Sequence, residues 1–305
     1  MNALARSWAM VAVLSGAAVS AAAQDKPEAP TGREFSAVNG TTIRCPLPQP
    51  RPAEATAAQF ETRPRDLDEM ARQAQAFFKG DSEIGKQFRA QQATRFAEDW
   101  PFLCRYRDAN ADLKASGNRP VAVFMGDSIT EGWIEADPAF FAPHRYVDRG
   151  ISGQSSAQMV ARFEQDVVAL HPSVVHILAG TNDIGGATGP ITEEEFVDNI
   201  RAMLDMARAN GIAVVLAGMP PMSRLLPRPE FDTRPVVPRL NARLRRLAKQ
   251  FGAIWVDYYA PLAASEGSFD PRYANDGVHP TRVGYSLMEP LAQAAIEKPF
   301  LRSRK

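Results

Sequence analysis

The chain has 305 residues, a formal net charge of zero, and 45% hydrophobic against 23% charged side chains. This length accommodates one large domain, or one domain with an extension. The composition is typical of a soluble globular protein. The zero net charge argues against a surface that as a whole grips nucleic acid or an anionic membrane.

The first 23 residues predict a secretory signal peptide. Arg6 gives a positively charged start, an apolar stretch runs from Trp8 to Val19, and three alanines precede Gln24. The apolar stretch is short for a membrane span, although an uncleaved anchor stays open as the alternative. We therefore expect a periplasmic or secreted protein that is cleaved after Ala23 and has no stable membrane insertion.

The next part of the chain predicts a linker and a helical extension. Residues 24–65 are rich in Pro and Ala, and we expect an extended linker or coil there. Residues 66–117 predict helices over 66–79 and 84–113, the second interrupted by Pro101. No catalytic motif lies in this extension. We expect it to pack on the main domain, and binding to a partner or to a cell wall is the alternative.

The two cysteines are Cys45 and Cys104. In an exported chain they can pair, but the sequence does not show whether they come close enough, so their pairing stays open. Neither lies in a C-x-x-C pair or beside a histidine, so we expect no metal site at either cysteine.

Strand-like and helix-like segments alternate over residues 118–298. Short apolar runs predict strands at 121–126, 146–149, 174–179, 213–219 and 254–258. Helices are predicted at 155–169, 192–210, 236–251 and 281–296. This alternation predicts an α/β fold in which helices cover both faces of a five-stranded parallel sheet. Residues 299–305 form a basic tail.

Four polar segments follow predicted strands or precede the last helix. They are Gly126-Asp127-Ser128, residues 149–155, Gly180-Thr181-Asn182-Asp183 and Asp276-Gly277-Val278-His279-Pro280. The first three follow consecutive strands, and the carboxyl ends of parallel strands form the edge at which open α/β sheets bind ligands. We therefore expect these segments to converge.

The residue types in these segments suit acyl transfer. A serine hydroxyl becomes a strong nucleophile when a base takes its proton, and histidine is the usual base near neutral pH. Asp276 and His279 are three residues apart, so one turn of chain can bring the carboxylate and the imidazole together. The Ser128 N–H, a glycine N–H of the second segment and the Asn182 amide are candidate donors to an oxyanion.

In their order and approximate spacing, the four segments resemble the sequence blocks of the SGNH (GDSL-type) esterase and lipase family. The resemblance covers residues 118–298, with Ile129 where the family usually has leucine. It implies a flavodoxin-like three-layer α/β/α sandwich and a chemistry that needs neither cofactor nor metal. It implies the catalytic residues Ser128, Asp276 and His279, and an oxyanion hole formed by Ser128, Gly153 and Asn182.

Other residues near these motifs have structural interpretations. Asp127 and Asp183 are expected to brace the neighbouring site residues, and His176 is expected to pack inside a strand. The segment Met219–Pro235 follows the fourth strand and is either an ordinary surface loop or a loop that overhangs the site.

The sequence thus predicts an exported esterase that acts through an acyl-enzyme on a small-molecule, glycan or lipid ester, and not on nucleic acid. O-acetyl groups on carbohydrate are the favoured substrate class. A lysophospholipase or thioesterase is the alternative. A carbohydrate- or cell-wall-binding protein is the alternative of another class, and the intact Ser, His and Asp set argues against it. The oligomeric state is not predicted.

Overall fold

The computed structural model describes residues 31–46, 60–61, 66–225 and 228–302. The predicted signal peptide and most of the predicted linker lie outside these ranges. Within them, none of the helices is both long and apolar enough to cross a membrane.

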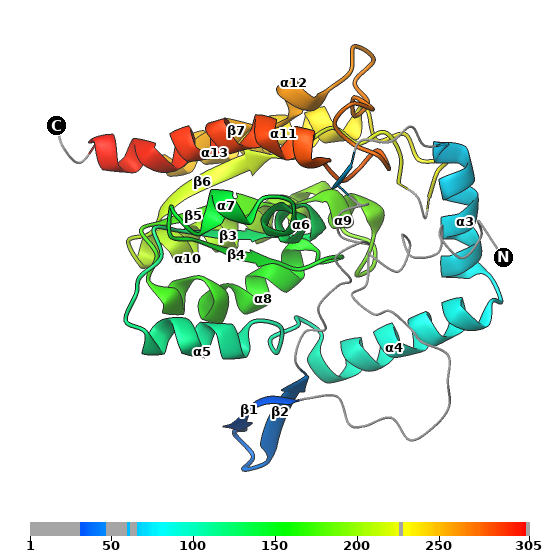
Figure 1. The fold of residues 1–305 in the computed structure, drawn as a ribbon. Helices are drawn as coiled ribbons and strands as arrows, with labels where there is room; N and C mark the ends of the chain where they lie inside the picture. Colours follow the sequence, from blue (N-terminus) through cyan, green and yellow to red (C-terminus); the bar gives the residue numbers. More distant parts are fainter. Residues whose placement is uncertain (1–30, 47–59, 62–65, 226–227, 303–305) are drawn as a thin grey trace.

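A five-stranded sheet forms the centre of the molecule (Figure 1). Its strands are β3 (Ala122–Gly126), β4 (Tyr146–Gly150), β5 (Val174–Leu178), β6 (Ala213–Gly218) and β7 (Ile254–Asp257). They pair in the order β4-β3-β5-β6-β7, and every pair is parallel. This is the flavodoxin-like order. The second strand along the chain, β4, lies on one side of β3, and the later strands are added one after another on the other side. The prediction of the fold is confirmed. Both the first and the last residue of each strand lie within one residue of the predicted position.

Helices cover both faces of the sheet, because successive side chains of a strand point to opposite sides. On one face, Val123 and Met125 pack with α8 (Ser156–Asp166), α10 (Glu193–Ala209) and α11 (Val236–Phe251). On the other, Ala122 and Phe124 pack with α6 (Ser128–Ala136), α7 (Pro138–Phe141) and α13 (Arg282–Arg302). Three short helices complete the domain: η2 (Val168–Leu170), α9 (Thr181–Gly185) and α12 (Tyr259–Leu262).

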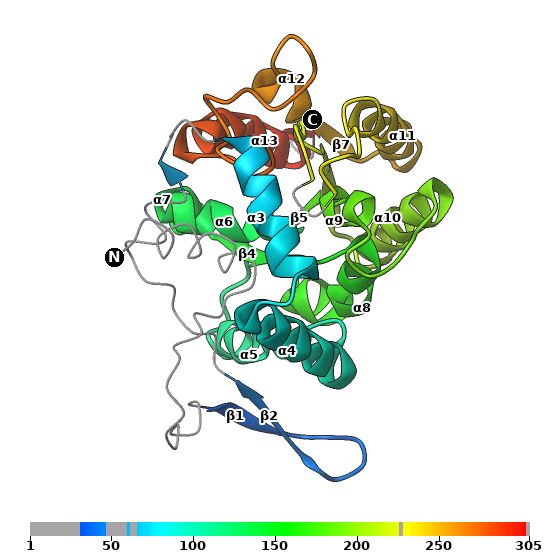
Figure 2. The same cartoon turned by 90° about the vertical axis from the view of Figure 1, so that its right-hand side faces the viewer.

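The predicted helical extension forms three helices, α3 (Leu67–Lys79), α4 (Glu83–Asp99) and α5 (Arg107–Ala115). The Asp66 carboxylate caps α3 by accepting from the N–H groups of Asp68 and Glu69. Figure 2 shows α3 crossing in front of β4, β5 and α9, on the side to which the strands direct their carboxyl ends. Arg224, in the segment after β6, forms an ion pair with Asp68 at the start of α3. The extension therefore reaches the edge of the sheet at which the sequence places the site.

A β-hairpin replaces part of the predicted linker. Strands β1 (Thr31–Ser36) and β2 (Thr42–Pro46) pair antiparallel within residues 24–65, where the sequence predicts coil. Most described hairpin side chains are exposed, so the strands lack the alternation of buried and exposed residues that reveals a strand in a sequence. The expectation of coil was wrong for this stretch.

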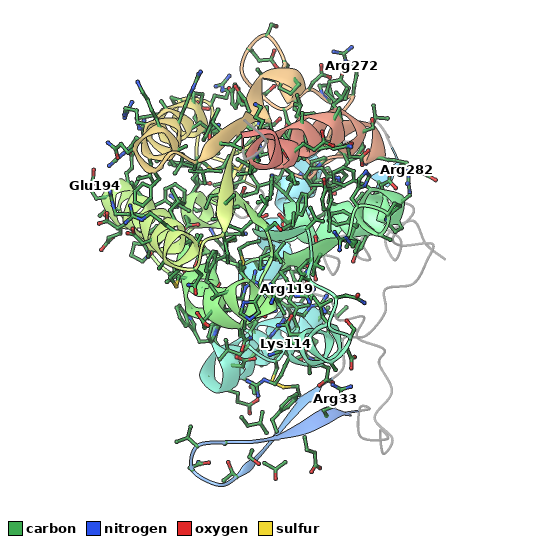
Figure 3. All side chains as sticks on the ribbon, turned by 90° about the vertical axis from the view of Figure 1, so that its left-hand side faces the viewer. Arg33, Lys114, Arg119, Glu194, Arg272 and Arg282 are labelled. Atoms are coloured by element: carbon green, nitrogen blue, oxygen red, sulfur yellow. A yellow bond between two sulfur atoms is a disulfide. The ribbon has the colours of Figure 1, made fainter. Side chains whose placement is uncertain are left out.

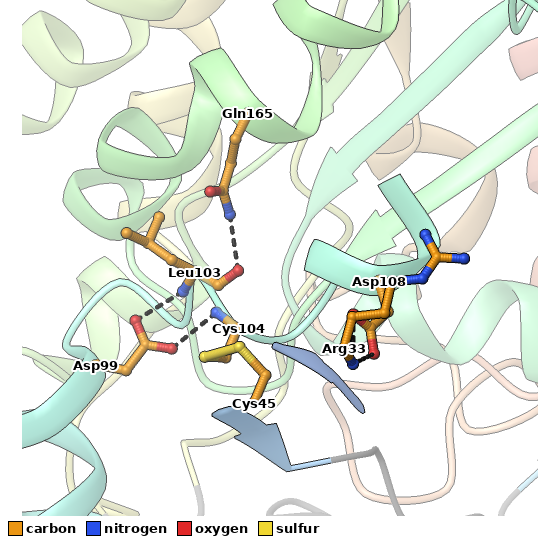
Figure 4. The surroundings of a disulfide bond; sticks show 7 residues. All are labelled: Arg33, Cys45, Asp99, Leu103, Cys104, Asp108 and Gln165. Atoms are coloured by element: carbon orange, nitrogen blue, oxygen red, sulfur yellow. Dashed lines mark hydrogen bonds between the residues drawn. A yellow bond between two sulfur atoms is a disulfide. The ribbon is translucent and has the colours of Figure 1, made fainter. Parts of the chain in front are cut away.

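A disulfide between Cys45 and Cys104 joins the hairpin to the chain between α4 and α5 (Figure 4), with the two Cα atoms 5.2 Å apart. Figure 3 shows the hairpin, with Arg33 labelled, projecting from the body of the molecule. The Arg33 N–H donates to both carboxylate oxygens of Asp108, at 3.2 and 3.0 Å. On the other side of the disulfide, Asp99 accepts from the N–H of Cys104 at 2.9 Å. The pairing that the sequence left open is thus present.

We expect Cys45→Ser to loosen the hairpin and to leave the sheet intact. An isolated two-stranded hairpin is marginally stable, and its other contacts to the body are exposed ones. Hydrogen–deuterium exchange of a peptide spanning residues 31–46 should accelerate by about tenfold or more. A peptide spanning β5 is the internal control and should exchange as in the unmodified protein. Unchanged protection of the hairpin would contradict this expectation.

Candidate active site

The predicted nucleophile lies in a tight turn between β3 and α6. Gly126 ends the strand, and a Cβ atom there would lie 2.0 Å from Thr130 Oγ1, so only glycine fits. Asp127 caps the helix, because its Oδ1 accepts from the Ile129 N–H at 2.9 Å. Ser128 is the first helical residue and is half-buried. The turn thus presents the Ser128 hydroxyl at the carboxyl edge of the sheet.

A hydrogen-bonded chain joins Ser128, His279 and Asp276. The Ser128 Oγ lies 2.8 Å from His279 Nε2, and His279 Nδ1 lies 2.6 Å from Asp276 Oδ2. The other carboxylate oxygen of Asp276 accepts from the N–H groups of Val278 and His279, at 2.9 and 2.8 Å. The structure therefore brings together the three residues that the sequence proposes as nucleophile, base and orienting acid.

The partners of Asp276 keep it ionised. Burial would raise the pKa of this carboxyl, but the nearby His279 and the hydrogen bonds from its ring and from two backbone N–H groups outweigh burial. They lower the pKa of Asp276 to about 2. A carboxylate at this position favours the imidazole tautomer that has its proton on Nδ1 and leaves Nε2 free to accept the serine proton.

Two further predicted residues follow the ends of β4 and β5: Gly153 lies in a loop, and Asn182 lies in α9. Gly153 is exposed with φ +82°, and its N–H donates to no other atom of the described residues. The Asn182 amide donates to Gln154 O at 3.0 Å and lies 3.4 Å from Asp127 Oδ2. The second contact is long, so one amide hydrogen is only weakly engaged and is available to another acceptor. The Gly153 N–H is thus free to donate to a ligand, and the Asn182 amide can do so by giving up its long contact with Asp127.

Asp127 and Asp183 brace the site, as the sequence analysis expects. Asp183 accepts from the Ser156 N–H at 3.0 Å and from its hydroxyl at 2.5 Å, which ties the loop after β5 to the start of α8. Burial raises the pKa of Asp127 to about 6 and also raises the pKa of Asp183. His176 packs against Phe124 in the sheet, also as expected.

The segment after β6 contacts the triad loop directly. The Ser223 N–H donates to Gly277 O at 2.8 Å, and a Cβ atom on Gly277 would lie 2.8 Å from Ser223 Cβ. Gly277 has φ +77°, a backbone conformation that glycine adopts without strain. The segment Met219–Pro235 therefore touches the triad loop at Ser223.

The site also has a set of contacts with the chain that joins α4 to α5, and these are not predicted from the sequence. Gln154 donates to Pro101 O at 2.9 Å, and Tyr106 donates its hydroxyl proton to Gly150 O. Arg105 forms an ion pair with Glu131 at 2.9 Å. No local pattern in the sequence signals these contacts, because each joins residues that are distant along the chain. Within the described ranges, no three His, Cys, Asp or Glu side chains are grouped so as to hold a metal ion.

Comparison with known proteins identifies the family. Residues 124–287, more than half of the chain, match the model of the GDSL-like Lipase/Acylhydrolase family. The chain belongs to this family. The matched residues include all the segments that form the site, from the end of β3 to the start of α13.

Two solved structures and one curated relative are similar to this family member. A GDSL-like lipase from Bacteroides thetaiotaomicron VPI-5482 is 40% identical with a TM-score of 0.63, and the match covers 66% of this chain and 100% of that chain. A protein of Bacteroides fragilis NCTC 9343 assigned as an acylhydrolase is 41% identical with a TM-score of 0.63, over 66% of this chain and 99% of that one. An acetylxylan esterase from Geobacillus stearothermophilus is 26% identical over 170 residues, which are 52% of this chain and 75% of that protein.

The buried carboxyl group of Asp148, in β4, predicts that the stability of the protein depends on pH. Burial raises the pKa of Asp148 from 3.8 to about 7, and its Oδ2 has no hydrogen-bond partner in the described structure. Between pH 4 and pH 7 the folded protein therefore holds a proton on Asp148 that the unfolded chain has released. The contribution of this group to the free energy of unfolding is greatest below pH 4 and falls as the pH rises towards 7.

We expect Asp148→Asn to remove this loss of stability. The amide oxygen can still accept the Gly150 N–H, which Asp148 Oδ1 accepts at 2.8 Å, and the amide does not ionise. At pH 8 the Tm should rise by an amount on the order of 5 °C, and at pH 4 it should change little. Asp81→Asn, at an exposed position, is the matched control. Parallel pH profiles for Asp148→Asn and the unmodified protein would contradict the expectation.

Proposed function

We propose that this chain is an exported serine esterase that hydrolyses carboxylic esters, short acyl esters of carbohydrate among them, through an acyl-enzyme at Ser128. One observation carries the proposal: the hydrogen-bonded chain from Ser128 Oγ through His279 to Asp276. It supplies a nucleophile, a base and an orienting carboxylate at one edge of the sheet.

In the first half of the reaction, Ser128 Oγ attacks the ester carbonyl while His279 Nε2 takes its proton. Asp276 stabilises the imidazolium that forms, and it can do so at neutral pH because its pKa is about 2. The carbonyl oxygen becomes an oxyanion, and the Ser128 N–H, the Gly153 N–H and the Asn182 amide are the donors that stabilise it. His279 then gives its proton to the alcohol, which leaves.

In the second half, water attacks the acyl-enzyme. His279 takes a proton from this water, the same donors stabilise the second oxyanion, and the proton returns to Ser128 Oγ as the acid departs. No step requires a redox change, and the same three side chains serve both halves.

The substrate class is proposed from the relatives. The relative from Geobacillus stearothermophilus is named an acetylxylan esterase, which supports a short acyl group on a carbohydrate. The lipolytic alternative is supported by a pocket that begins at Asp183, next to Asn182, and has a mixed lining. Its polar lining residues are Asp183, Thr192, Glu193 and Arg239. Its apolar lining residues are Ile184, Ile191, Phe196, Phe231, Val236 and Leu240.

Export is proposed from two observations. The first 23 residues have the pattern of a signal peptide. The Cys45–Cys104 disulfide is the kind of bond that forms and persists outside the reducing cytoplasm. Together they support a periplasmic or secreted protein.

We expect Ser128→Ala to reduce the turnover of p-nitrophenyl acetate by at least about a thousandfold, because the nucleophile is lost while the fold keeps its core. Circular dichroism and the Tm should stay close to those of the unmodified protein. Ser286→Ala, at an exposed serine of α13, is the matched control and should retain full activity. Substantial turnover by Ser128→Ala would refute the assignment of the nucleophile.

We expect kcat/KM for p-nitrophenyl esters to fall by about tenfold or more from acetyl to octanoyl. A short acyl group needs only the space beside Ser128, whereas a long chain needs an apolar channel. Acetate release from acetylated xylo-oligosaccharides should exceed fatty-acid release from a lysophospholipid under the same conditions. The reverse order in both assays would establish the lipolytic alternative.

A further inference from the structure

The loop that presents the Gly153 N–H is closed by one backbone hydrogen bond of its own, from the Gln154 N–H to Ile151 O at 3.2 Å. Gly153 is exposed, and a Cβ atom placed on it would meet nothing within 4 Å. A donor to an oxyanion works only if it already points to where the charge develops. The orientation of the Gly153 N–H must therefore be imposed by its neighbours in the chain.

The residue immediately before Gly153 is held by a buried carboxylate. Glu131 Oε2 accepts from the Ser152 N–H at 2.9 Å and also from the Ser152 hydroxyl. Glu131 is only 8% exposed and lies in the first turn of α6, three residues after Ser128. One side chain thus joins the helix that carries the nucleophile to the loop that carries Gly153.

The second oxygen of the same carboxylate is held from the opposite side. Arg105 Nη2 donates to Glu131 Oε1 at 2.9 Å, from the chain between α4 and α5. The Arg105 guanidinium lies over the ring of Tyr106, whose hydroxyl donates to Gly150 O in the same loop as Ser152. Glu131 is therefore fixed between a cation and two donors of the loop and has little freedom to turn.

The neighbouring restraints act on other residues of the loop. Gln154 is held by its bond to Pro101 O, and Ser156 is held by Asp183. These contacts fix the loop after Gly153. Before Gly153, the Ile151 N–H donates to Gly126 O at 3.1 Å, and Glu131 holds Ser152 itself. The φ and ψ angles at Ser152 and Gly153 decide where the Gly153 N–H points, so both sides are needed.

We propose that Glu131 is a positioning residue for the oxyanion hole: it holds Ser152 so that the Gly153 N–H points to the carbonyl oxygen of an ester at Ser128. Arg105 holds the carboxylate in place for this task. The inference rests on the proposed function, because it requires Ser128 as nucleophile and Gly153 as donor.

The test is Glu131→Gln, assayed with p-nitrophenyl acetate. The amide keeps the size of the side chain, but its NH₂ group cannot accept, so it cannot serve both Ser152 and Arg105. We expect kcat to fall by about 10- to 100-fold with KM nearly unchanged, because the contact acts on the charge of the transition state. Glu164→Gln, at an exposed glutamate of α8, is the matched control and should leave kcat unchanged.

Two further measurements separate positioning from a general loss of structure. The inhibition constant of phenylboronic acid, which forms a tetrahedral adduct with an active serine, should rise in parallel with the fall in kcat/KM. In a double-mutant cycle, Ser152→Ala should cost much less activity in the Glu131→Gln background than in the unmodified protein, because both changes disturb the same contact of the Ser152 hydroxyl with Glu131, while the backbone N–H is kept. Arg105→Gln should also lower kcat and raise the inhibition constant of phenylboronic acid, by smaller factors than Glu131→Gln. This variant provides the test if Glu131→Gln does not fold.

Unchanged kcat in Glu131→Gln, or fully additive effects of the Glu131 and Ser152 changes, would overturn the positioning role. Ser128→Ala in the same assay reports on the proposed function by itself. If Ser128→Ala is inactive while Glu131→Gln retains full kcat, only the role of Glu131 fails. If Ser128→Ala retains turnover, the proposed function fails and the role of Glu131 fails with it.

Discussion

The site depends on a backbone contact that leaves no room for a side chain. At the end of β4, a Cβ atom on Gly150 would lie 2.1 Å from the Glu131 N and 2.8 Å from Asp127 O, both at the start of α6. Only a hydrogen atom fits there, so the loop after β4 can lie against the first turn of the helix that carries Ser128. The Ile151 N–H completes the contact by donating to Gly126 O at 3.1 Å. This contact holds the start of the loop that carries Gly153 against the turn that carries Ser128.

The carboxyl groups around the site differ in the partners they have. Burial raises the pKa of Asp127 to about 6 and that of Asp148 to about 7, since their hydrogen-bond donors are neutral backbone, hydroxyl or amide groups. Asp276 is also buried, yet His279 and two backbone N–H groups lower its pKa to about 2. The protein thus keeps one carboxylate firmly ionised beside the base and leaves two others close to protonation. Position in the fold, and not residue type, makes this distinction.

The sequence predicts the sheet well, since β3, β5 and β6 are short apolar runs that can only be buried. It also predicts that the segments with Ser128, Gly153 and Asn182 converge, because the carboxyl ends of neighbouring parallel strands share an edge. His279 follows no strand end, so its place beside Ser128 is implied by the family resemblance and not by the strand pattern. The sequence does not predict the ion pair of Arg105 with Glu131, which joins two polar residues that no periodicity relates. The pairing of Cys45 with Cys104 stayed open for the same physical reason. The distance between two residues that are remote along the chain is set by the packing of the whole fold, and a local sequence pattern carries no information about it.

Helix α5 and the chain that joins it to α4 share buried polar contacts with the sheet and its helices. Asn110 donates to Asp166 Oδ1 at 2.6 Å and accepts from Arg149 Nε at 2.8 Å, while Arg105 is the ion-pair partner of Glu131. A fragment that began at residue 118, where the strand and helix alternation starts, would keep every proposed catalytic residue. It would nevertheless leave Glu131, Arg149 and Asp166 each short of one partner, at about 1–3 kcal/mol for each buried group. A shortened form of this protein that keeps these partners must therefore begin upstream of β3, before Arg105.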